Sequence, residues 1–264
     1  MIKWKRLLCL GMAASMMLSI TAYGDVIDFT GPEGQVSAAE SPGPSTPSAP
    51  SGSDSSQNPA SSVAVEKPTV QSEGAVLLNA NTGEILFEKN GNTRFYPASI
   101  TKLMTALLTV ENCSLSDTVT FSKTATTNLE SGAVTLNLTE GDQLTVEQCL
   151  YGLLLKSANE IANGLAEHIS GSVSSFADKM NARAKELGCT DTHFVNPNGL
   201  NNTEHYTTPR DMAIIARAAF QNPTVAKVAS TLSYEFPATK KASARTITMG
   251  HKMLYPNDSR YYDG

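Results

Sequence analysis

The sequence has 264 residues, of which 41% are hydrophobic and 17% charged, and its formal net charge at neutral pH is −5. A slightly acidic chain with no basic cluster among aromatic residues is not expected to bind nucleic acid. The length is sufficient for one domain with a sizeable core, accompanied by segments that do not fold into it.

The first 24 residues have the pattern of a secretory signal peptide. Three basic residues at positions 3, 5 and 6 precede an apolar run at 7–20, and AYG at 22–24 is a small-x-small cleavage site. The apolar run is short for a membrane span, although an uncleaved anchor is an alternative. We therefore expect a protein that is secreted or bound to the outer face of the cell membrane, and membrane association stays open.

Residues 25–67 differ abruptly in composition and are rich in serine and proline. Such a segment has little apolar surface to bury, so it cannot offset the entropy lost on ordering. We predict a disordered linker, which could also serve as a tether, and a folded domain at 68–264.

Three cysteines remain after removal of the signal, namely Cys113, Cys149 and Cys189. Their odd number and wide spacing do not predict a disulfide framework. Cys149 lies in an apolar helical pattern and is expected to be a buried small hydrophobe.

The folded part is expected to be α+β. Strands at 73–79 and 84–88 flank the turn residues at 81–83, which predicts a hairpin. Apolar residues at helical spacing then predict several helices, and two short strands follow at 232–236 and 246–249. The predicted helices begin near Ser99, after Thr145, near 161, before 176 and after Thr208, and the fourth ends at Gly188. This order indicates a helical subdomain inserted between the strands of an antiparallel sheet.

Ser99 and Lys102 are the first candidate site residues. Their spacing places a hydroxyl and an amine on one face of a helix, and a serine beside a deprotonated lysine is a nucleophile that needs no histidine. The pattern alone is weak, because an N-cap serine followed by a solvated lysine gives the same letters.

Ser157 and Asn159 are the second pair, at the break between two apolar helices. They could present another hydroxyl and a carboxamide to Ser99, although Ser157 could equally cap the following helix. The same tripeptide pattern occurs at 56–58 in the linker, so order and context must decide.

In order and context the chain resembles the serine-type D-alanyl-D-alanine carboxypeptidases of peptidase family S11. These low-molecular-mass penicillin-binding proteins share a fold with the serine β-lactamases. The resemblance runs from about residue 74 to the last residue. It rests on YPASITKLMT at 96–105, LLLKSANE at 153–160, MNARAKELG at 180–188, THFVNPNGL at 192–200 and HYTTPRDMA at 205–213.

The resemblance implies that Ser99 is the acylated nucleophile and Lys102 the general base, whose pKa must then be depressed below the ordinary value of ~10.4. It also implies that Ser157 relays a proton and that Asn159 binds the substrate backbone and helps to fix Lys102. The expected substrate is a peptidoglycan stem peptide ending in D-Ala-D-Ala. β-Lactam antibiotics are the expected inhibitors, and the expected roles are in peptidoglycan biosynthesis, cell-wall organisation and cell shape.

The sequence departs from the family pattern in three places. Alanine stands at 158 in place of the usual glycine, and glutamate at 160 in place of the usual aspartate. The third family motif, Lys-Thr-Gly, does not occur, and KTA at 123–125 precedes Ser157 and lacks the glycine. The sequence stops at YYDG (261–264), close to where that motif is expected. We therefore expect a truncated catalytic domain that lacks its C-terminal strands and has little or no activity alone.

Several alternatives stay open. A β-lactamase, a D,D-endopeptidase or a transpeptidase could use the same scaffold, and a non-enzymatic module could bind wall peptides. The four histidines, at 168, 193, 205 and 251, show no metal-ligand spacing, so neither a metal nor a cofactor is expected.

Overall fold

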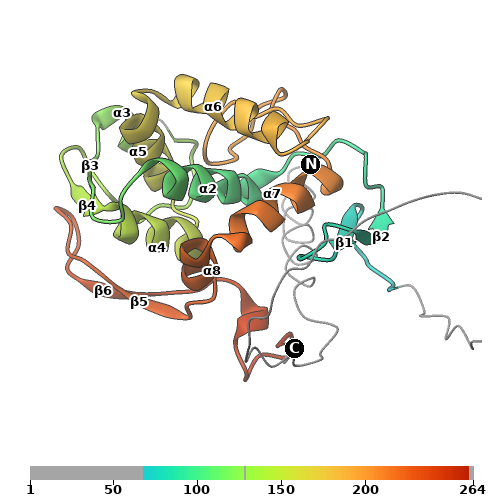
Figure 1. Ribbon diagram of the computed structural model, residues 1–264. Helices are drawn as coiled ribbons and strands as arrows, with labels where there is room; N and C mark the ends of the chain where they lie inside the picture. Colours follow the sequence, from blue (N-terminus) through green and yellow to red (C-terminus); the bar gives the residue numbers. More distant parts are fainter. Residues whose placement is uncertain (1–67, 128, 262–264) are drawn as a thin grey trace, which may run out of the picture. The chain divides into compact units, whose positions relative to one another are not determined.

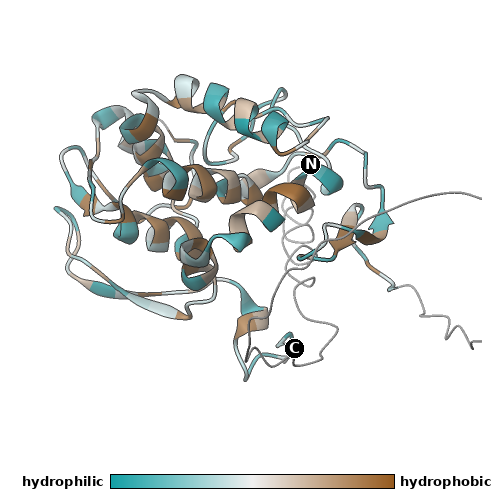
Figure 2. Cartoon of the chain, viewed as in Figure 1, coloured by the Kyte–Doolittle hydropathy of each residue, from teal (hydrophilic) through white to brown (hydrophobic). Residues whose placement is uncertain are grey.

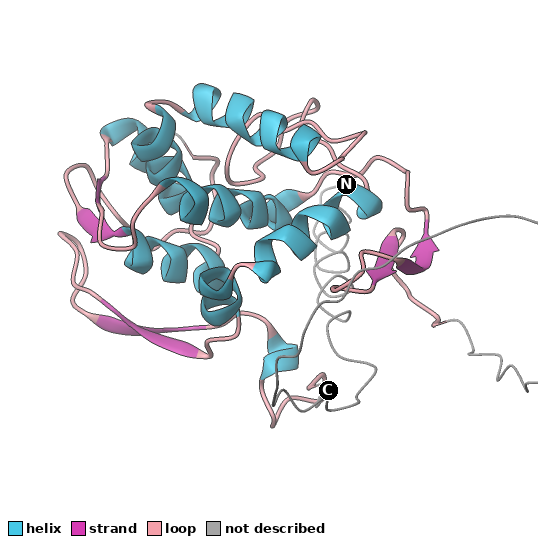
Figure 3. Cartoon of the chain, in the orientation of Figure 1, coloured by secondary structure: helices cyan, strands magenta, loops and turns pink. Residues whose placement is uncertain are grey.

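The structure is a computed structural model that describes residues 68–127 and 129–261. The predicted signal peptide and linker lie outside these residues. Within them the chain begins with a hairpin, continues mainly through helices, and reaches a second hairpin that is followed by a short 3-10 helix (Figures 1 and 3). Among the described residues, no helix has the length and apolar character required to span a bilayer.

The first hairpin pairs β1 (Ala75–Leu78) with β2 (Ile85–Lys89) in antiparallel register, as predicted. The Asn79 carboxamide accepts hydrogen bonds from two backbone N–H groups of the turn, and Gly83 adopts a φ of 79° that favours glycine. The buried side chains of β1 pack against helix α7. The hairpin is therefore joined to the helical part by apolar contacts.

Helix α2 (Lys102–Asn112) is central to the helical part. All of residues 102–109 are buried, and α2 contacts helices α4, α5, α6, α7 and α8. In Figure 2 brown, hydrophobic residues run along α2, whereas α6 carries more teal, hydrophilic ones. The other helices are η2 (Ala98–Thr101), α3 (Lys123–Thr127), α4 (Val146–Lys156), α5 (Asn159–Ser170), α6 (Val173–Glu186), α7 (Pro209–Gln221), α8 (Pro223–Ala229) and η3 (Lys252–Leu254).

The helix ends follow their capping residues. Thr145 and Gln148 form a capping box at the start of α4, and the Thr208 side chain accepts from the Asp211 N–H at the start of α7, followed by Pro209. Gly188, with a φ of 90°, directly follows the C-cap of α6. These predicted ends are confirmed. Cys149 is fully buried, as predicted.

The described strands form three separate antiparallel pairs rather than one sheet. Besides β1–β2, β3 (Thr118–Thr120) pairs with β4 (Gln143–Thr145), and β5 (Ser233–Phe236) pairs with β6 (Arg245–Thr248). The pairs contact different elements, because β1 packs on α7 whereas β5 and β6 pack on α4. The fold class is α+β, as predicted.

Candidate active site

Ser99 lies in η2, one turn before α2, rather than in the α-helix itself. The preceding residue, Ala98, has a φ of 49°, in the left-handed region that non-glycine residues seldom adopt. Ser99 is exposed, whereas the Lys102 side chain points inward and the residue is only 1% exposed. The Lys102 Nζ lies 3.3 Å from the Ser99 Oγ. The fold therefore brings the two predicted residues together, with the amine of a buried lysine beside an exposed serine.

Two further oxygens surround the Lys102 amine. Its Nζ donates to Asn159 Oδ1 at 2.9 Å and to the backbone carbonyl of Asn198 at 2.7 Å. The Asn159 amide is oriented by its Nδ2, which donates to the Val134 carbonyl at 2.9 Å. Both neighbours of the amine are therefore acceptors, fixed by the residues around them.

Burial lowers the pKa of Lys102 from 10.5 to about 7, against the opposing effect of the Glu160 carboxylate. A neutral amine has two hydrogens and one lone pair. If the hydrogens go to Asn159 Oδ1 and the Asn198 carbonyl, the lone pair is left for the Ser99 hydroxyl. This geometry suits the transfer of a proton from Ser99 to Lys102.

Glu160 is a buried carboxylate beside this site, and sequence reasoning assigned it no role. Its Oε1 accepts from the backbone N–H of Leu136 at 2.5 Å and from that of Leu138 at 3.4 Å. Burial raises the pKa of the Glu160 carboxyl, and these backbone donors oppose the rise. Among described residues its Oε2 has no hydrogen-bond partner. Glu160 thus places a negative charge near the lysine.

Ser157 is the C-cap of α4 and adopts a left-handed conformation with a φ of 58°. It lies at the break between α4 and α5, two residues before Asn159, as the sequence indicated. Within the described part of the chain, no hydrogen bond joins its hydroxyl to Ser99 or Lys102. Its role as a proton relay therefore stays a proposal.

Residues 196–200, the end of the THFVNPNGL motif, close the other side of the site, and no role there was predicted for them. The Thr105 hydroxyl donates to the Pro197 carbonyl at 2.6 Å, and the Asn198 side chain donates to Asn163 at 2.9 Å. Gly199 has a φ of 82°, and a Cβ there would lie 1.8 Å from the Ala98 carbonyl oxygen. The loop therefore fits directly against the turn that carries Ser99.

His205 joins the same loop region to the start of α2. It is 2% exposed, and burial lowers its pKa from 6.5 to about 4, so the ring is neutral near pH 7. Its Nδ1 accepts from the Val195 N–H at 3.1 Å, which leaves the proton on Nε2. Nε2 then donates to the Thr101 hydroxyl at 2.8 Å. These two bonds give His205 a structural role, since they join the Val195 backbone to Thr101 at the start of α2.

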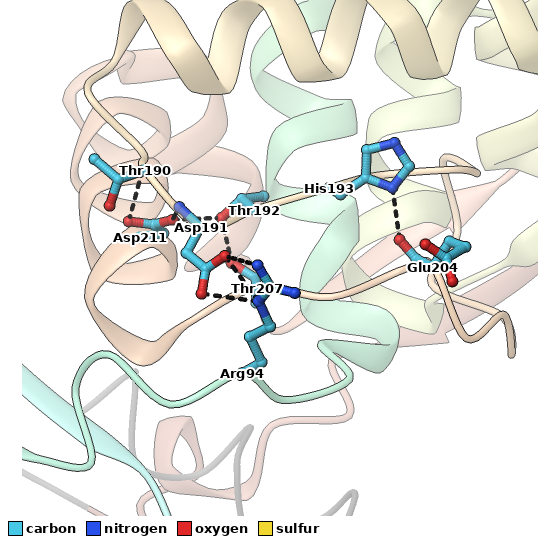
Figure 4. Close-up of polar contacts among 8 residues, drawn as sticks. All are labelled: Arg94, Thr190, Asp191, Thr192, His193, Glu204, Thr207 and Asp211. Carbon is cyan, nitrogen blue, oxygen red and sulfur yellow. Dashed lines mark hydrogen bonds and ion pairs between the residues drawn. The ribbon is translucent and has the colours of Figure 1, made fainter.

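A polar network anchors the segment that leads into this loop (Figure 4). Asp211, in the first turn of α7, accepts from the Thr190 and Asp191 N–H groups and from the Thr192 hydroxyl. Asp191 in turn forms a bidentate ion pair with Arg94, just ahead of the Ser99 turn. The network ties α7, the 190–208 segment and the Ser99 turn together.

A cavity of about 660 Å³ opens beside this turn, a size typical of small-molecule sites. It is lined by residues 94–98, which lead to Ser99, and by residues 199–206. None of Ser99, Lys102, Ser157 and Asn159 lines this cavity, so it adjoins the Ser99 turn only through Ala98.

Comparisons with known proteins show which family the chain is similar to. The family model described as D-alanyl-D-alanine carboxypeptidase matches residues 61–264. The D-alanyl-D-alanine carboxypeptidase DacF of Bacillus subtilis is 39% identical over 166 residues, which are 61% of this chain and 42% of the relative. The D-alanyl-D-alanine carboxypeptidase of Streptomyces sp. K15 is 39% identical over 197 residues, 70% of this chain and 67% of the relative.

Solved structures match the fold as well. The crystal structure of the Streptomyces K15 DD-transpeptidase matches with a TM-score of 0.67 at 35% identity, over 72% of this chain and 78% of that one. A D-alanyl-D-alanine carboxypeptidase from Mycobacterium tuberculosis matches with a TM-score of 0.67 at 30% identity, over 74% and 73%. The chain spans less than half the length of the B. subtilis relative.

Proposed function

The chain belongs to the D-alanyl-D-alanine carboxypeptidase family, and we propose that it acts as a serine D,D-carboxypeptidase through an acyl-enzyme at Ser99. The observation that carries this proposal is the position of the buried Lys102 amine, 3.3 Å from the Ser99 hydroxyl and bound to two acceptors. The proposed substrate is a peptidoglycan stem peptide ending in D-Ala-D-Ala, and β-lactams would acylate the same serine.

In the acylation step, Lys102 Nζ accepts the Ser99 proton as Oγ attacks the carbonyl of the penultimate D-Ala. The C–N bond to the terminal D-Ala breaks, and the leaving amine takes a proton that returns from Lys102 through the Ser157 hydroxyl. Water then hydrolyses the ester and regenerates Ser99. Asn159 keeps one amide N–H beyond its bond to Val134, and this hydrogen is available to the substrate backbone.

A transpeptidase is the second candidate, because a matching solved structure is named a DD-transpeptidase. It would form the same acyl-enzyme and transfer the acyl group to an amine instead of water. Product analysis with and without an added amine acceptor separates the two. A β-lactamase, a D,D-endopeptidase and a non-enzymatic wall-peptide module have no specific observation in their favour.

The finer parts of the proposal concern the whole protein. Residues 1–24 would direct export, and residues 25–67 would link them to a catalytic domain at 68–264. This domain would act outside the cytoplasm and, in one alternative, at the membrane surface. Because residues 1–264 contain no Lys-Thr-Gly, they should release little or no D-Ala when expressed alone. Full hydrolytic turnover by residues 1–264 would refute this part.

Covalent labelling of the whole protein with a fluorescent penicillin tests the central proposal. We expect a labelled band, with the adduct on the peptide that contains Ser99, and no labelling of Ser99→Ala. Ser174→Ala, at an exposed position on α6, is the matched control and should label normally. Labelling that persists unchanged in Ser99→Ala would refute the assignment. Release of D-Ala from a D-Ala-D-Ala peptide by the whole protein tests the activity itself.

A further inference from the structure

Three side chains with metal-binding atoms meet at the far end of α2. The Cys113 sulfur, a carboxylate oxygen of Asp117 and a ring nitrogen of His168 all lie within 4.8 Å of one another. Cys113 is the C-cap of α2, Asp117 directly precedes β3, and His168 is in the last turn of α5. These elements are neighbours in the fold, since α5 packs against both α2 and β3 (Figure 1).

The backbone holds the first two of these residues in place. The Cys113 N–H donates to the Thr109 carbonyl at 3.0 Å and so closes the end of α2. Asp117 is held in a tight turn, because its N–H donates to the Ser114 carbonyl and its Oδ2 accepts from the Ser114 N–H at 2.8 Å. Its own carbonyl accepts from the Val146 N–H at 2.9 Å. The carboxylate is therefore oriented by its surroundings, as metal-binding carboxylates usually are.

The donor atoms are not used by other contacts. In the described part of the structure, neither the Cys113 sulfur nor the His168 ring forms a hydrogen bond, and Asp117 Oδ1 accepts none. His168 is exposed and Cys113 is half-buried, so an ion from solvent can reach the cluster. A thiolate and a carboxylate supply two negative charges, which match a divalent cation.

Positive charges around the cluster reduce its affinity for a cation but do not prevent a cation from binding. The Lys179 ammonium is close enough to lower the Cys113 pKa, although burial and Asp117 together raise it. Lys179 itself donates to Asn112 at 3.0 Å, and the nearby Arg183 is paired with Glu111. Within the described residues no ion pair involves Lys179, so its positive charge acts on the cluster against two potential anions.

We propose that Cys113, Asp117 and His168 form a binding site for a divalent cation of the zinc type, with water in the fourth position. Tetrahedral zinc with bonds of about 2.0–2.3 Å keeps its ligand atoms about 3.3–3.8 Å apart, so atoms that lie within 4.8 Å of one another need to approach by at most about 1.5 Å. Binding would replace the thiol proton of Cys113, which passes to solvent.

This site is separate from the Ser99 centre and independent of the proposed function. At 1.5 Å per residue, Cys113 lies about 16 Å along the helix from Lys102. The ion would join the end of α2 to α5 and to the turn before β3, so its expected role is structural. No local spacing in the sequence predicts it, because Cys113 and His168 are far apart in the chain.

Titration of the purified, reduced chain with Co²⁺ tests the proposal through a spectroscopic signal. We expect one equivalent of Co²⁺ to produce a near-ultraviolet thiolate-to-cobalt band, and Zn²⁺ to abolish the band by displacing Co²⁺. Cys113→Ser should lose the band, and His168→Ala should weaken Co²⁺ binding at least ten-fold. Cys189→Ser is the matched control, because Cys189 is a second half-buried thiol outside the cluster.

A stability measurement completes the test. Saturating Zn²⁺ should raise the melting temperature of the unmodified chain and of Cys189→Ser, but not that of His168→Ala, whose exposed side chain can be removed without disturbing the fold. Far-ultraviolet circular dichroism checks that each variant is folded. Co²⁺ binding without the thiolate band, or a band that survives Cys113→Ser, would overturn the proposal, as would unchanged affinity in His168→Ala.

Discussion

The rate of Ser99 acylation should follow the titration of Lys102. Burial lowers the Lys102 pKa to about 7, and only the neutral amine can accept the Ser99 proton. A base with that pKa is neutral in roughly one tenth of molecules at pH 6, one half at pH 7 and nine tenths at pH 8. The acylation rate should therefore rise about ten-fold from pH 6 to pH 8 and then level off.

Glu160→Gln probes the electrostatic part of this argument. The Glu160 carboxylate raises the Lys102 pKa, so its removal should lower the apparent pKa of acylation. The amide oxygen can still accept from the Leu136 N–H, so the local fold is retained. The rate at pH 6 should rise relative to that at pH 8, by roughly ten-fold at most, because the lysine is already mostly neutral at pH 8. Glu167→Gln, two turns further along α5, should leave the profile unchanged.

The assay is the initial rate of covalent labelling by a penicillin that has no titrating group in this pH range. The assay uses the whole protein, and circular dichroism establishes that the fold is intact at each pH. A rate that climbs ten-fold per pH unit up to pH 9 would reveal a lysine with an ordinary pKa. A rate independent of pH would point to another base. Either result refutes the reasoning, as does a Glu160→Gln profile displaced to higher pH.

Three further predictions follow from the same geometry. Ser157→Ala should slow acylation about 10²- to 10⁴-fold, the usual contribution of a proton-transferring group, with an unchanged far-ultraviolet spectrum; unaltered labelling would exclude the relay. Gly199→Ala should lower both the melting temperature and the labelling rate, because its Cβ would meet the Ala98 carbonyl; Gly188→Ala, with equally positive φ but open space around it, should affect only stability. For His205 the folded-state pKa is depressed from 6.5 to about 4, so its stabilising effect is complete above about pH 6.5 and is lost as pH falls towards 4, by about 3 kcal/mol. Denaturant unfolding of His205→Gln at pH 4.5 and pH 7 should show a smaller difference than the unaltered chain; an equal difference contradicts the assignment.

Local signals predicted most of the helix ends correctly. The Thr145 and Thr208 caps and the glycine after α6 act within one turn of chain, so the sequence carries their full signature. The shortest elements were not predicted: β3 and β4 have three residues each, and α3 and α8 have five and seven. Segments of this length hold too few residues to establish a period.

The site was predictable only where side chains form a recognisable motif. Ser99, Lys102 and Asn159 have such a motif, whereas the Asn198 group that binds Lys102 is a backbone carbonyl, which every residue possesses. The contact joins positions 96 residues apart. The bond between Thr101 and His205 spans 104 residues. The partners of a buried lysine are determined by long-range packing, which sequence periodicity does not record.

The two departures from the family pattern next to Asn159 have a physical account. Ala158 has φ −64° and ψ 120°, a conformation open to any residue, so its methyl group introduces no backbone strain. Glu160 is one methylene longer than aspartate, and its carboxylate bonds to the backbone of residues 136 and 138. The segment 134–138 also orients the Asn159 amide, which donates to the Val134 carbonyl. Arg245 of β6 holds this segment by donating to the Leu136 carbonyl. Glu160 thus raises the Lys102 pKa and also holds the segment that orients Asn159, so a substitution that removes its acceptor oxygen as well as its charge should alter both the pKa of Lys102 and the placement of Asn159.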